Sequence, residues 1–395
     1  MAACAAPSHS RRVAVLGGGI IGLSCAWRLA AAGHLVTLFD PAVGGGATYA
    51  AAGMVAPASE AVFGQDALLA VGLESALRWP RFALDLAHDA GCVLELAPRG
   101  VLLVALDADD EVVLGRHARH VERRGCHVER LTSRSARRLE PALSPRVTGA
   151  VLLRESAVDP RAVSDALAKA FIARGGTVLP VAAEPVVRDG SVRAVRAVTD
   201  LPGGAEAGAG AGRQLEVDDV VVAAGWRSPA SLTMLPHPVR VHPLKGQVVR
   251  LGVPPGTLGH TVRASVRGRD VYVVPRPRGE LVVGATSEDV GADLTVTAGG
   301  VHDLLHDAIE VIPVIAEAEL RESTARLRPA TVDNLPLVGP TCIEGLMVAT
   351  GHGRDGILLA PLSAEAMLAH VERRSPPRGA DVLAAQRLCV PEEHS

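Results

Sequence analysis

The stretch that most constrains the fold is VAVLGGGIIG, at residues 13–22. Four apolar residues run into three glycines, and two isoleucines and a fourth glycine follow before an apolar pattern of helical spacing. We predict a buried parallel strand over residues 12–16, a tight turn, and a helix from residue 20 to about residue 32. A second strand is expected over residues 35–39. This order of elements predicts an α/β fold that opens with a Rossmann-like unit.

The glycines fit the pattern G-x-G-x-x-G, in which each position has a physical task. Gly17 permits the tight turn, Gly19 lets the backbone approach a pyrophosphate, and Gly22 lets helix and strand pack closely. Asp40 ends the second strand, where it can accept hydrogen bonds from ribose hydroxyls and would repel a 2′-phosphate. The pattern therefore predicts a dinucleotide site that disfavours NADP, although the glycines alone do not separate NAD from FAD. The plain alternative is an ordinary glycine turn in an α/β protein.

Composition excludes several functional classes. The chain of 395 residues is long enough for two domains, and its net charge of -3 argues against a nucleic-acid or acidic-lipid partner. Its six cysteines include no C-x-x-C pair, which predicts reduced thiols in a cytoplasmic protein, with neither a disulfide framework nor a metal site. No apolar run is long enough to span a membrane.

Arg11 and Arg12 before an apolar stretch could mark an export signal, but such a signal needs neither the glycines nor Asp40.

Three more segments rich in small residues lie far apart in the sequence. They are GGGATYAAAGMVAP at 44–57, VVVAAG at 220–225 and GHGRDGILLAP at 351–361. Small side chains let the backbone pass close to a flat or phosphorylated ligand, so we predict that these segments build one cofactor site together with the first turn. A flexible linker is the alternative for residues 44–57. Residues 201–212 are of low complexity and predict a disordered hairpin tip.

Taken with VDP, PLKGQ, YVVPR, LVVGAT and RLRP, these motifs resemble the D-amino acid oxidase family of FAD-dependent oxidoreductases. They follow the family's order over nearly the whole chain, and within the family they are most similar to the bacterial glycine oxidases of thiamine biosynthesis. The resemblance implies a Rossmann-like FAD-binding domain built from discontinuous segments, residues 1–60, 150–235 and 325–395. Residues 61–149 and 236–324 would form an α+β substrate domain with a mostly antiparallel sheet.

The resemblance implies noncovalent FAD. Family members with covalent flavin carry a cysteine near the carboxylate-binding arginine, and no cysteine lies between Cys126 and Cys342. FAD would lie extended along the first domain, and the N-terminus of the last long helix would give N–H groups to the flavin. The residues implied in cofactor binding come from several segments. They are Gly17, Gly19, Ile20, Ile21 and Gly22; Asp40 and Pro41; Ala47, Thr48, Ala52, Gly53 and Met54; Val186; and His352, Gly353, Arg354, Asp355, Gly356, Ile357 and Leu358.

The resemblance also implies a small amino-acid substrate. Arg328 in RLRP matches the family's carboxylate-binding arginine, which would hold a carboxylate by two parallel hydrogen bonds. Tyr272 in YVVPR matches a tyrosine that closes over the substrate, and Arg354 matches a second residue at the substrate site. A solvated surface charge is the alternative for each arginine, and a core strand position is the alternative for Tyr272. Ser287 stands where close relatives often carry a larger apolar residue, so the size of the substrate is open.

The implied reaction is the oxidative deamination of glycine, with sarcosine and small D-amino acids as further candidates. Hydride transfer to flavin N5 would give the imine and then glyoxylate and ammonia, and dioxygen would reoxidise the flavin to give hydrogen peroxide. The family also implies a homo-oligomer whose imine product supplies thiazole synthesis. Three alternatives stay open: another amine or D-amino acid oxidase or dehydrogenase of the same fold, a flavin-binding protein without turnover, and an NAD-dependent dehydrogenase.

Overall fold

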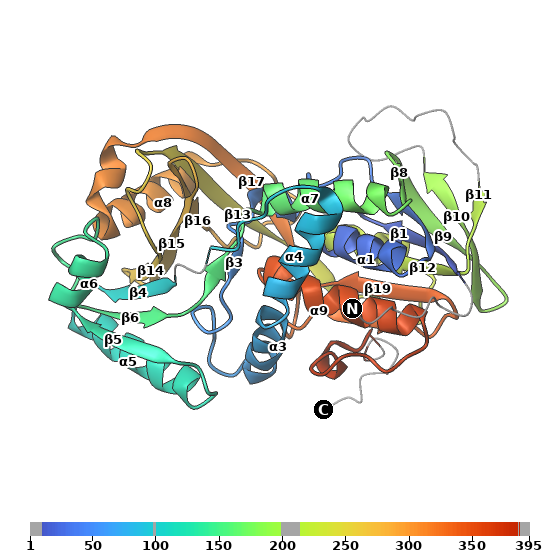
Figure 1. Cartoon of the computed structure of the whole chain (residues 1–395), viewed down its shortest axis with the longest axis horizontal. Coiled ribbons are helices and arrows are strands. Elements are labelled where there is room, and N and C mark those ends of the chain that lie inside the picture. The colour runs from blue at the N-terminus through green and yellow to red at the C-terminus, as the bar shows by residue number, and fades with distance from the viewer. Residues whose placement is uncertain (1–9, 98–99, 199–213, 386, 388–395) are drawn as a thin grey trace.

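The computed structural model describes residues 10–97, 100–198, 214–385 and 387, which form an elongated molecule of two lobes (Figure 1). Each lobe is built around one large sheet. Segments that are distant in the sequence meet in both sheets, because the chain passes from one lobe to the other and back. Within the described ranges, no helix combines the length and the apolar character needed to cross a membrane.

The first lobe holds a six-stranded, mainly parallel sheet. Its strands, in spatial order, are β18 (Leu337–Pro340), β19 (Leu346–Thr350), β12 (Asp219–Val222), β1 (Arg12–Leu16), β2 (Leu35–Phe39) and β8 (Thr177–Leu179). All neighbours are parallel except β18 and β19. The central strands are short apolar runs because both faces of the sheet are covered.

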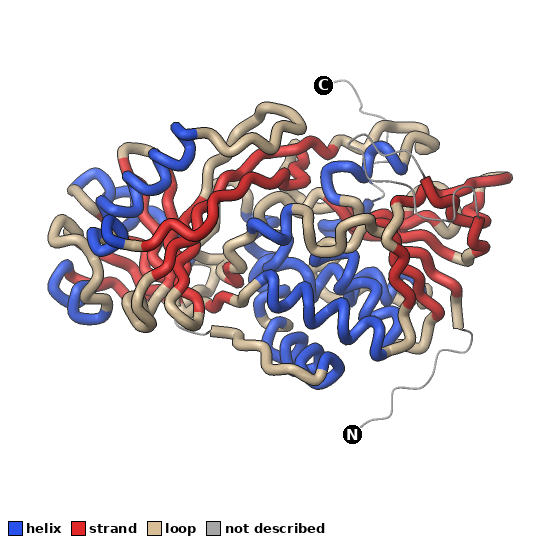
Figure 2. The backbone as a smooth tube through the Cα atoms, turned by 90° about the horizontal axis from the view of Figure 1, so that it is seen from above, coloured by secondary structure: helices blue, strands red, loops and turns tan. Residues whose placement is uncertain are grey.

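Helices cover one face of this sheet and a small antiparallel sheet covers the other. The helices are α1 (Ile20–Ala31), α3 (Asp66–Ala76), α4 (Trp79–Ala90), α7 (Pro160–Ala173) and α9 (Gly356–Val371). Figure 2 shows them gathered beside the strands, and their apolar side chains form one core with Val13, Val15 and Val221. The small sheet consists of β9 (Ala182–Arg188), β10 (Ser191–Val198) and β11 (Gln214–Glu216). It packs on Ala14 and Val220, which point to the opposite face of the large sheet.

The second lobe holds an eight-stranded sheet. Its strands, in spatial order, are β17 (Glu319–Thr331), β13 (Val241–Gly252), β16 (Glu280–Gly284), β15 (Arg269–Arg276), β14 (Thr261–Val266), β4 (Val101–Ala105), β6 (Gly149–Leu153) and β5 (Val128–Thr132). All neighbours are antiparallel except β14 and β4. α8 (Ala298–Val311) packs on one face through Leu304 and Ala308. α5 (Ala108–Glu122) and α6 (Ser133–Leu139) lie at the β5–β6 end.

The two lobes join where a short segment of the first packs on the second sheet. The segment contains α2 (Ala47–Ala50) and β3 (Met54–Val55), and β3 pairs with β7 (Ser156–Ala157). Ala52 and Met54 belong to the same apolar cluster as Val274 and Val282 of the second sheet. The cofactor-binding segment expected from the sequence is therefore buried between the lobes.

The predicted fold class is confirmed, with one parallel and one mostly antiparallel sheet. Residues 66–90 form two helices, α3 and α4, and Pro80 lies in the first turn of α4, where no helical hydrogen bond needs its missing N–H. α7 follows Val158, and Asp159 caps this helix by accepting the Arg161 N–H. The hairpin tip expected over residues 201–212 lies outside the described residues.

Candidate active site

The glycine turn lies between β1 and α1, at the carboxyl ends of the parallel strands. Gly17 has a φ of 109°, and a Cβ there would overlap the Ala223 carbonyl. A Cβ at Gly22 would overlap the Gly17 carbonyl, so α1 can approach the turn only because Gly22 lacks a side chain. Gly19 differs, since among the described atoms a Cβ there would meet only the Thr48 hydroxyl, at 3.5 Å. The space beside Gly19 is therefore open.

Asp40 and Thr48 contact the turn from outside. The Asp40 carboxylate accepts hydrogen bonds from the Gly18 N–H and from the Ala42 N–H, the latter at 2.6 Å. Carboxylate oxygens have further lone pairs, so Asp40 can still accept from a ligand. The buried Thr48 hydroxyl accepts the Ile20 N–H at 2.9 Å and so caps the first N–H of α1. This capping contact was not predicted from the sequence, which placed Thr48 only along the phosphates.

Five arginine side chains hold residues 44–60, which comprise the small-residue segment at 44–57 and the three residues after it. Each donates a hydrogen bond to a backbone carbonyl of the segment. The pairs are Arg326 with Gly45 (2.9 Å), Arg161 with Tyr49 (3.0 Å), Arg276 with Ala52, Arg263 with Ser59 (2.8 Å) and Arg354 with Glu60 (2.9 Å). The Tyr49 ring also contacts the Arg161 and Arg326 guanidinium groups, at 3.6 and 4.9 Å from its centroid. Arg326 is thus held against this segment and is not a solvated surface charge, and sequence spacing gave no signal of these contacts.

Gly53 makes the turn in this segment possible. Its φ is 76°, and a Cβ there would overlap the Val158 carbonyl. The Val158 N–H donates to the Gly53 carbonyl at 2.9 Å, which ties the segment to the start of α7. Ala52 and Met54 on either side are buried. The motif AAAGM is therefore explained locally by one left-handed glycine between two buried apolar residues.

Glu155 holds the far end of the segment. Its carboxylate accepts the Ala58 N–H at 2.6 Å and the Ser59 N–H at 3.1 Å. Desolvation raises the pKa of Glu155 to about 7, and these hydrogen bonds oppose the rise only in part. Between pH values of about 4.5 and about 7, the folded protein therefore holds a proton on Glu155 that an unfolded chain has released.

This raised pKa predicts a pH-dependent stability. Because the native state binds the extra proton, its free energy of unfolding should fall as the pH rises from about 5 to about 8. Glu155→Gln removes this titration. We therefore expect the free energy of unfolding of the variant, measured relative to that of wild type, to be higher at pH 8 than at pH 5 by about 1–3 kcal/mol. Urea unfolding at both pH values measures it. Glu129→Gln, at an exposed position on β5, is the control, and equal changes in the two variants would contradict the assignment.

Tyr272 and Arg328 lie together on the second sheet. Burial raises the pKa of the Tyr272 hydroxyl, and the nearby Arg328 charge lowers it. The Arg328 guanidinium crosses β13 above Gly246, where a Cβ would lie 2.5 Å from Arg328 Cζ, and it donates to the Thr286 carbonyl at 3.1 Å. Within the described part of the chain, Arg328 forms no ion pair with a carboxylate. A half-buried arginine therefore has N–H groups left for an external carboxylate.

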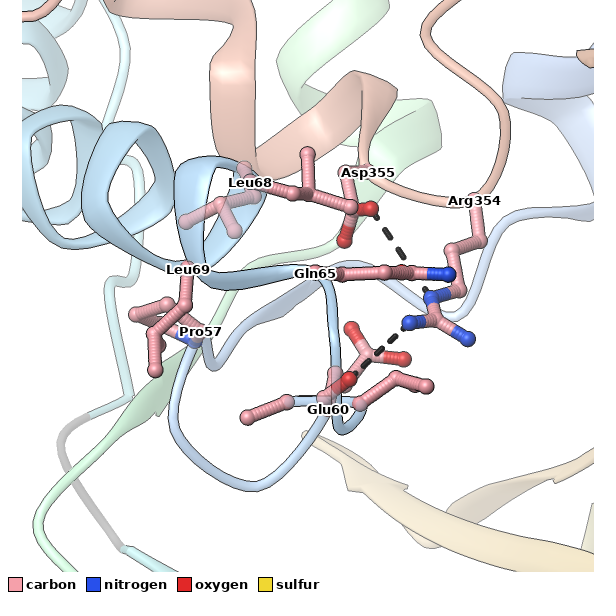
Figure 3. Close-up of a pocket in the computed structure, with 10 residues that line it drawn as sticks. Pro57, Glu60, Gln65, Leu68, Leu69, Arg354 and Asp355 are labelled. Carbon is pink, nitrogen blue, oxygen red and sulfur yellow. Dashed lines mark hydrogen bonds and ion pairs between the residues drawn. The ribbon is translucent and has the colours of Figure 1, made fainter. Parts of the chain in front are cut away.

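Arg354 lies beside a small pocket between α3 and the start of α9 (Figure 3). The pocket is lined by Pro57, Glu60, Ala61, Val62, Gln65, Leu68, Leu69, Arg354, Asp355 and Leu358. The exposed Arg354 side chain donates to the Glu60 carbonyl, and its Nε lies 3.8 Å from the Asp355 carboxylate. Burial and the Glu60 charge raise the pKa of Asp355 to about 7. The Glu60 carboxylate also lies 3.6 Å from the Arg263 guanidinium, and its charge raises the pKa of Tyr272. Glu60 is therefore a neighbour both of Arg354 and of the Tyr272–Arg328 pair.

The C-terminal turn is attached to the strand that carries Arg328. The Gly353 N–H donates to the Pro329 carbonyl at 2.8 Å. His352 is buried, its Nε2 lies 2.9 Å from the Ser363 hydroxyl, and desolvation lowers its pKa to about 3, so the ring is neutral. The turn following β19 is thereby fixed beside Arg328 before α9 begins.

The other predicted cofactor residues occupy three environments. Ile20, Ile21, Ile357 and Leu358 are buried at the starts of α1 and α9, while Pro41 is exposed and Ala47 and Gly356 are half-buried. Val186 lies in β9, an edge strand of the small sheet, so part of its backbone faces away from any other described strand. The described residues contain no cluster of three or more His, Cys, Asp or Glu side chains suited to a metal ion.

Comparisons with known proteins identify the family of this chain. A family model described as FAD dependent oxidoreductase matches residues 12–370. Glycine oxidase of Geobacillus kaustophilus is 32% identical over 371 residues, which cover 93% of this chain and 94% of that protein. The bifunctional protein ThiO/ThiG of Trichormus variabilis is 30% identical over 371 residues, 93% of this chain and 54% of that protein. The crystal structure of the G. kaustophilus glycine oxidase matches with a TM-score of 0.86 at 30% identity, covering 96% of this chain and 99% of that one.

The two-lobed fold and these relatives define a flavin-dependent oxidoreductase. The chain belongs to the D-amino acid oxidase family of FAD-dependent oxidoreductases, and FAD is its cofactor. The resemblance drawn from the motifs is confirmed.

Proposed function

We propose that this protein is an amino-acid oxidase that oxidatively deaminates glycine, with sarcosine and small D-amino acids as further candidate substrates. The observation that carries the proposal is Arg328, a half-buried arginine that lies beside Tyr272 and has no carboxylate partner among the described residues. A planar guanidinium recognises a carboxylate through two parallel hydrogen bonds. The names of the relatives support the same substrate class.

The residues present fit FAD. The open space beside Gly19 and the N-terminus of α1 suit a pyrophosphate, and Asp40 lies where it can accept from ribose hydroxyls. We propose that Ala52, Gly53 and Met54, together with residues 352–358, hold the flavin end, and that Val186 presents its backbone to the adenine. Bound FAD supplies a hydride acceptor that dioxygen can reoxidise. We further propose that the flavin is held noncovalently, in a domain formed by residues 1–60, 150–235 and 325–395 together with α3 and α4, which share its core.

On the substrate side, each named residue has a task. Arg328 orients the substrate carboxylate and so fixes the Cα–H relative to the flavin. Tyr272 keeps its proton at neutral pH, because burial raises its pKa, and can donate a hydrogen bond to the substrate. Arg354 is proposed as a second, more exposed contact.

The product is proposed to supply thiazole synthesis. The bifunctional relative is named for two components, ThiO and ThiG, and this chain spans about half of the length of that relative. An imine released beside a partner enzyme could be used before it hydrolyses to glyoxylate and ammonia. We also propose a homo-oligomer, which the sequence resemblance implies, and a cytoplasmic location, which the unpaired pattern of the cysteines favours.

The proposal is tested by anaerobic reduction of the yellow enzyme. Glycine, sarcosine, D-alanine and an amine without a carboxylate are added in turn, and loss of the flavin absorption is followed. We expect reduction by at least one of the three amino acids and hydrogen peroxide after air is admitted. Reduction by the amine alone would replace the proposal with an amine oxidase. Reduction without peroxide would indicate a dehydrogenase.

A further inference from the structure

The segment Lys245–Gly246–Gln247 of β13 holds a loop that the proposed reaction does not explain. After β16 the chain continues along β13: the Lys245 N–H donates to the Glu288 carbonyl at 2.9 Å, and the Glu288 N–H returns to the Lys245 carbonyl at 3.0 Å. The Thr286 N–H donates to the Gln247 carbonyl at 3.2 Å. The loop at residues 285–297 is therefore fixed to β13 through its backbone.

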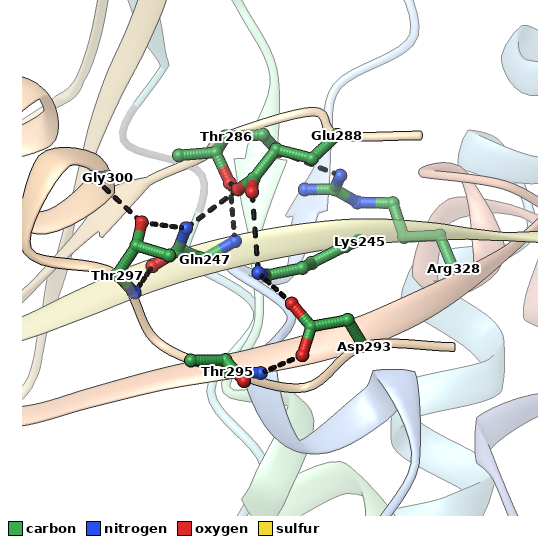
Figure 4. A network of polar contacts seen from close by, with 9 residues as sticks. All are labelled: Lys245, Gln247, Thr286, Glu288, Asp293, Thr295, Thr297, Gly300 and Arg328. Carbon is green, nitrogen blue, oxygen red and sulfur yellow. Dashed lines mark hydrogen bonds and ion pairs between the residues drawn. The ribbon is translucent and has the colours of Figure 1, made fainter. Parts of the chain in front are cut away.

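Side chains fix the same loop from one face of β13 (Figure 4). The Lys245 ammonium lies 2.8 Å from the Asp293 carboxylate and 3.4 Å from the Glu288 carboxylate, and only 1% of its side chain is exposed. The Asp293 hydrogen bond raises the pKa of Lys245, so the ammonium stays charged. Asp293 itself is 41% exposed. Lys245 is thus covered by the loop that it holds.

Gln247 completes the network. Its amide nitrogen donates to Glu288 at 2.7 Å and to the Thr297 hydroxyl at 3.0 Å, and its amide oxygen accepts the Thr297 N–H at 2.8 Å. The Thr286 hydroxyl donates to Glu288 and accepts the Gln247 N–H. These side chains join both ends of the loop to one strand.

The network reaches the opposite face of β13 through the backbone carbonyl of Thr286. Side chains alternate along a strand, so Lys245 and Gln247 share one face and Gly246 belongs to the other. Arg328 crosses that other face above Gly246 and donates to the Thr286 carbonyl at 3.1 Å. The position of the Arg328 guanidinium therefore depends on where the loop holds Thr286.

We propose that Lys245 is a positioning residue for substrate recognition: through Asp293 and Glu288 it fixes the loop at 285–297, and through the Thr286 carbonyl the loop sets the direction of Arg328. This inference rests on the proposed function, in which Arg328 binds a substrate carboxylate. It also explains the motif PLKGQ, in which the lysine and glutamine hold the loop and the glycine leaves room for the arginine.

The test is a double-mutant cycle with Lys245→Met and Arg328→Ala. Lys245→Met should lower kcat/KM for the best carboxylate substrate by about 10- to 100-fold, mainly through KM, because a misplaced binding group loses this much. Flavin reduction by an amine without a carboxylate should stay within about twofold of wild type. In the Arg328→Ala background, Lys245→Met should add nothing. Lys169→Met, which removes the other lysine of the chain, is the matched control and should behave as wild type.

Lys245→Met removes one partner of a buried ion pair, which can prevent folding because such a loss is strongly destabilising. A second variant therefore tests the same inference with a milder change. Asp293→Asn changes the half-exposed partner and should give a smaller loss with the same dependence on the substrate carboxylate, while Lys245→Arg should restore part of the activity. An equal loss for both substrates, or an additive loss in the Arg328→Ala background, would overturn the inference. If Arg328→Ala itself leaves the amino-acid reaction unchanged, the proposed function fails instead.

Discussion

Arg328→Ala should leave the protein folded and yellow but should cost about 2–5 kcal/mol of transition-state binding in kcat/KM for the amino-acid substrate. The reason is that Arg328 is half-buried and its one described hydrogen bond goes to the Thr286 carbonyl, which leaves other N–H groups for a carboxylate. An amine without a carboxylate should be almost indifferent to the change. The measurement is anaerobic flavin reduction at low substrate concentration, compared between the two substrates.

Two variants sharpen this result. Arg328→Lys keeps the charge but not the planar pair of donors, so it should recover only part of the loss. Arg321→Ala, at an exposed position of the same strand, should match wild type. An Arg328→Ala enzyme that is reduced by the amino acid as fast as wild type would remove the central support for an amino-acid oxidase. The amine oxidase alternative would then be preferred.

Gly22→Ala should destabilise the folded protein by about 3 kcal/mol or more and abolish FAD retention. A Cβ at Gly22 overlaps the Gly17 carbonyl oxygen, and neither backbone segment can move without shifting β1 or α1. Gly19→Ala should behave differently. Its φ of -73° suits alanine, and among the described residues a Cβ there meets only the Thr48 hydroxyl, at 3.5 Å. The apoprotein of this variant should therefore stay near wild-type stability.

The comparison of the two glycines isolates the cofactor contact. If a pyrophosphate lies against Gly19, the added methyl group should weaken FAD binding by at least about tenfold while thermal unfolding of the apoprotein hardly changes. FAD binding to the two apoproteins and their unfolding midpoints are measured side by side. Unchanged FAD affinity in Gly19→Ala would show that the open space beside this residue does not receive the pyrophosphate.

The sequence by itself determined the first unit of the fold. The strand, turn and helix over residues 12–32 are local structures, since apolar periodicity and the glycine positions specify them without distant contacts. The motifs spread along the chain likewise identified the family and its cofactor, because each motif is a short run of residues that specifies its own local backbone conformation. The division of residues 66–90 into α3 and α4 was less visible, since both helices have apolar faces of similar character.

Only the tertiary structure decided which charged side chains belong to the site. In a chain with 40 lysine and arginine residues, local sequence cannot distinguish Arg326, which donates to the Gly45 carbonyl, from a solvated arginine. The raised pKa of Glu155 and the burial of Lys245 arise from segments that are far away in the sequence. Both effects depend on desolvation and on partners that tertiary packing brings close, residues 58–59 for Glu155 and the loop at 285–297 for Lys245, and no local pattern contains these partners.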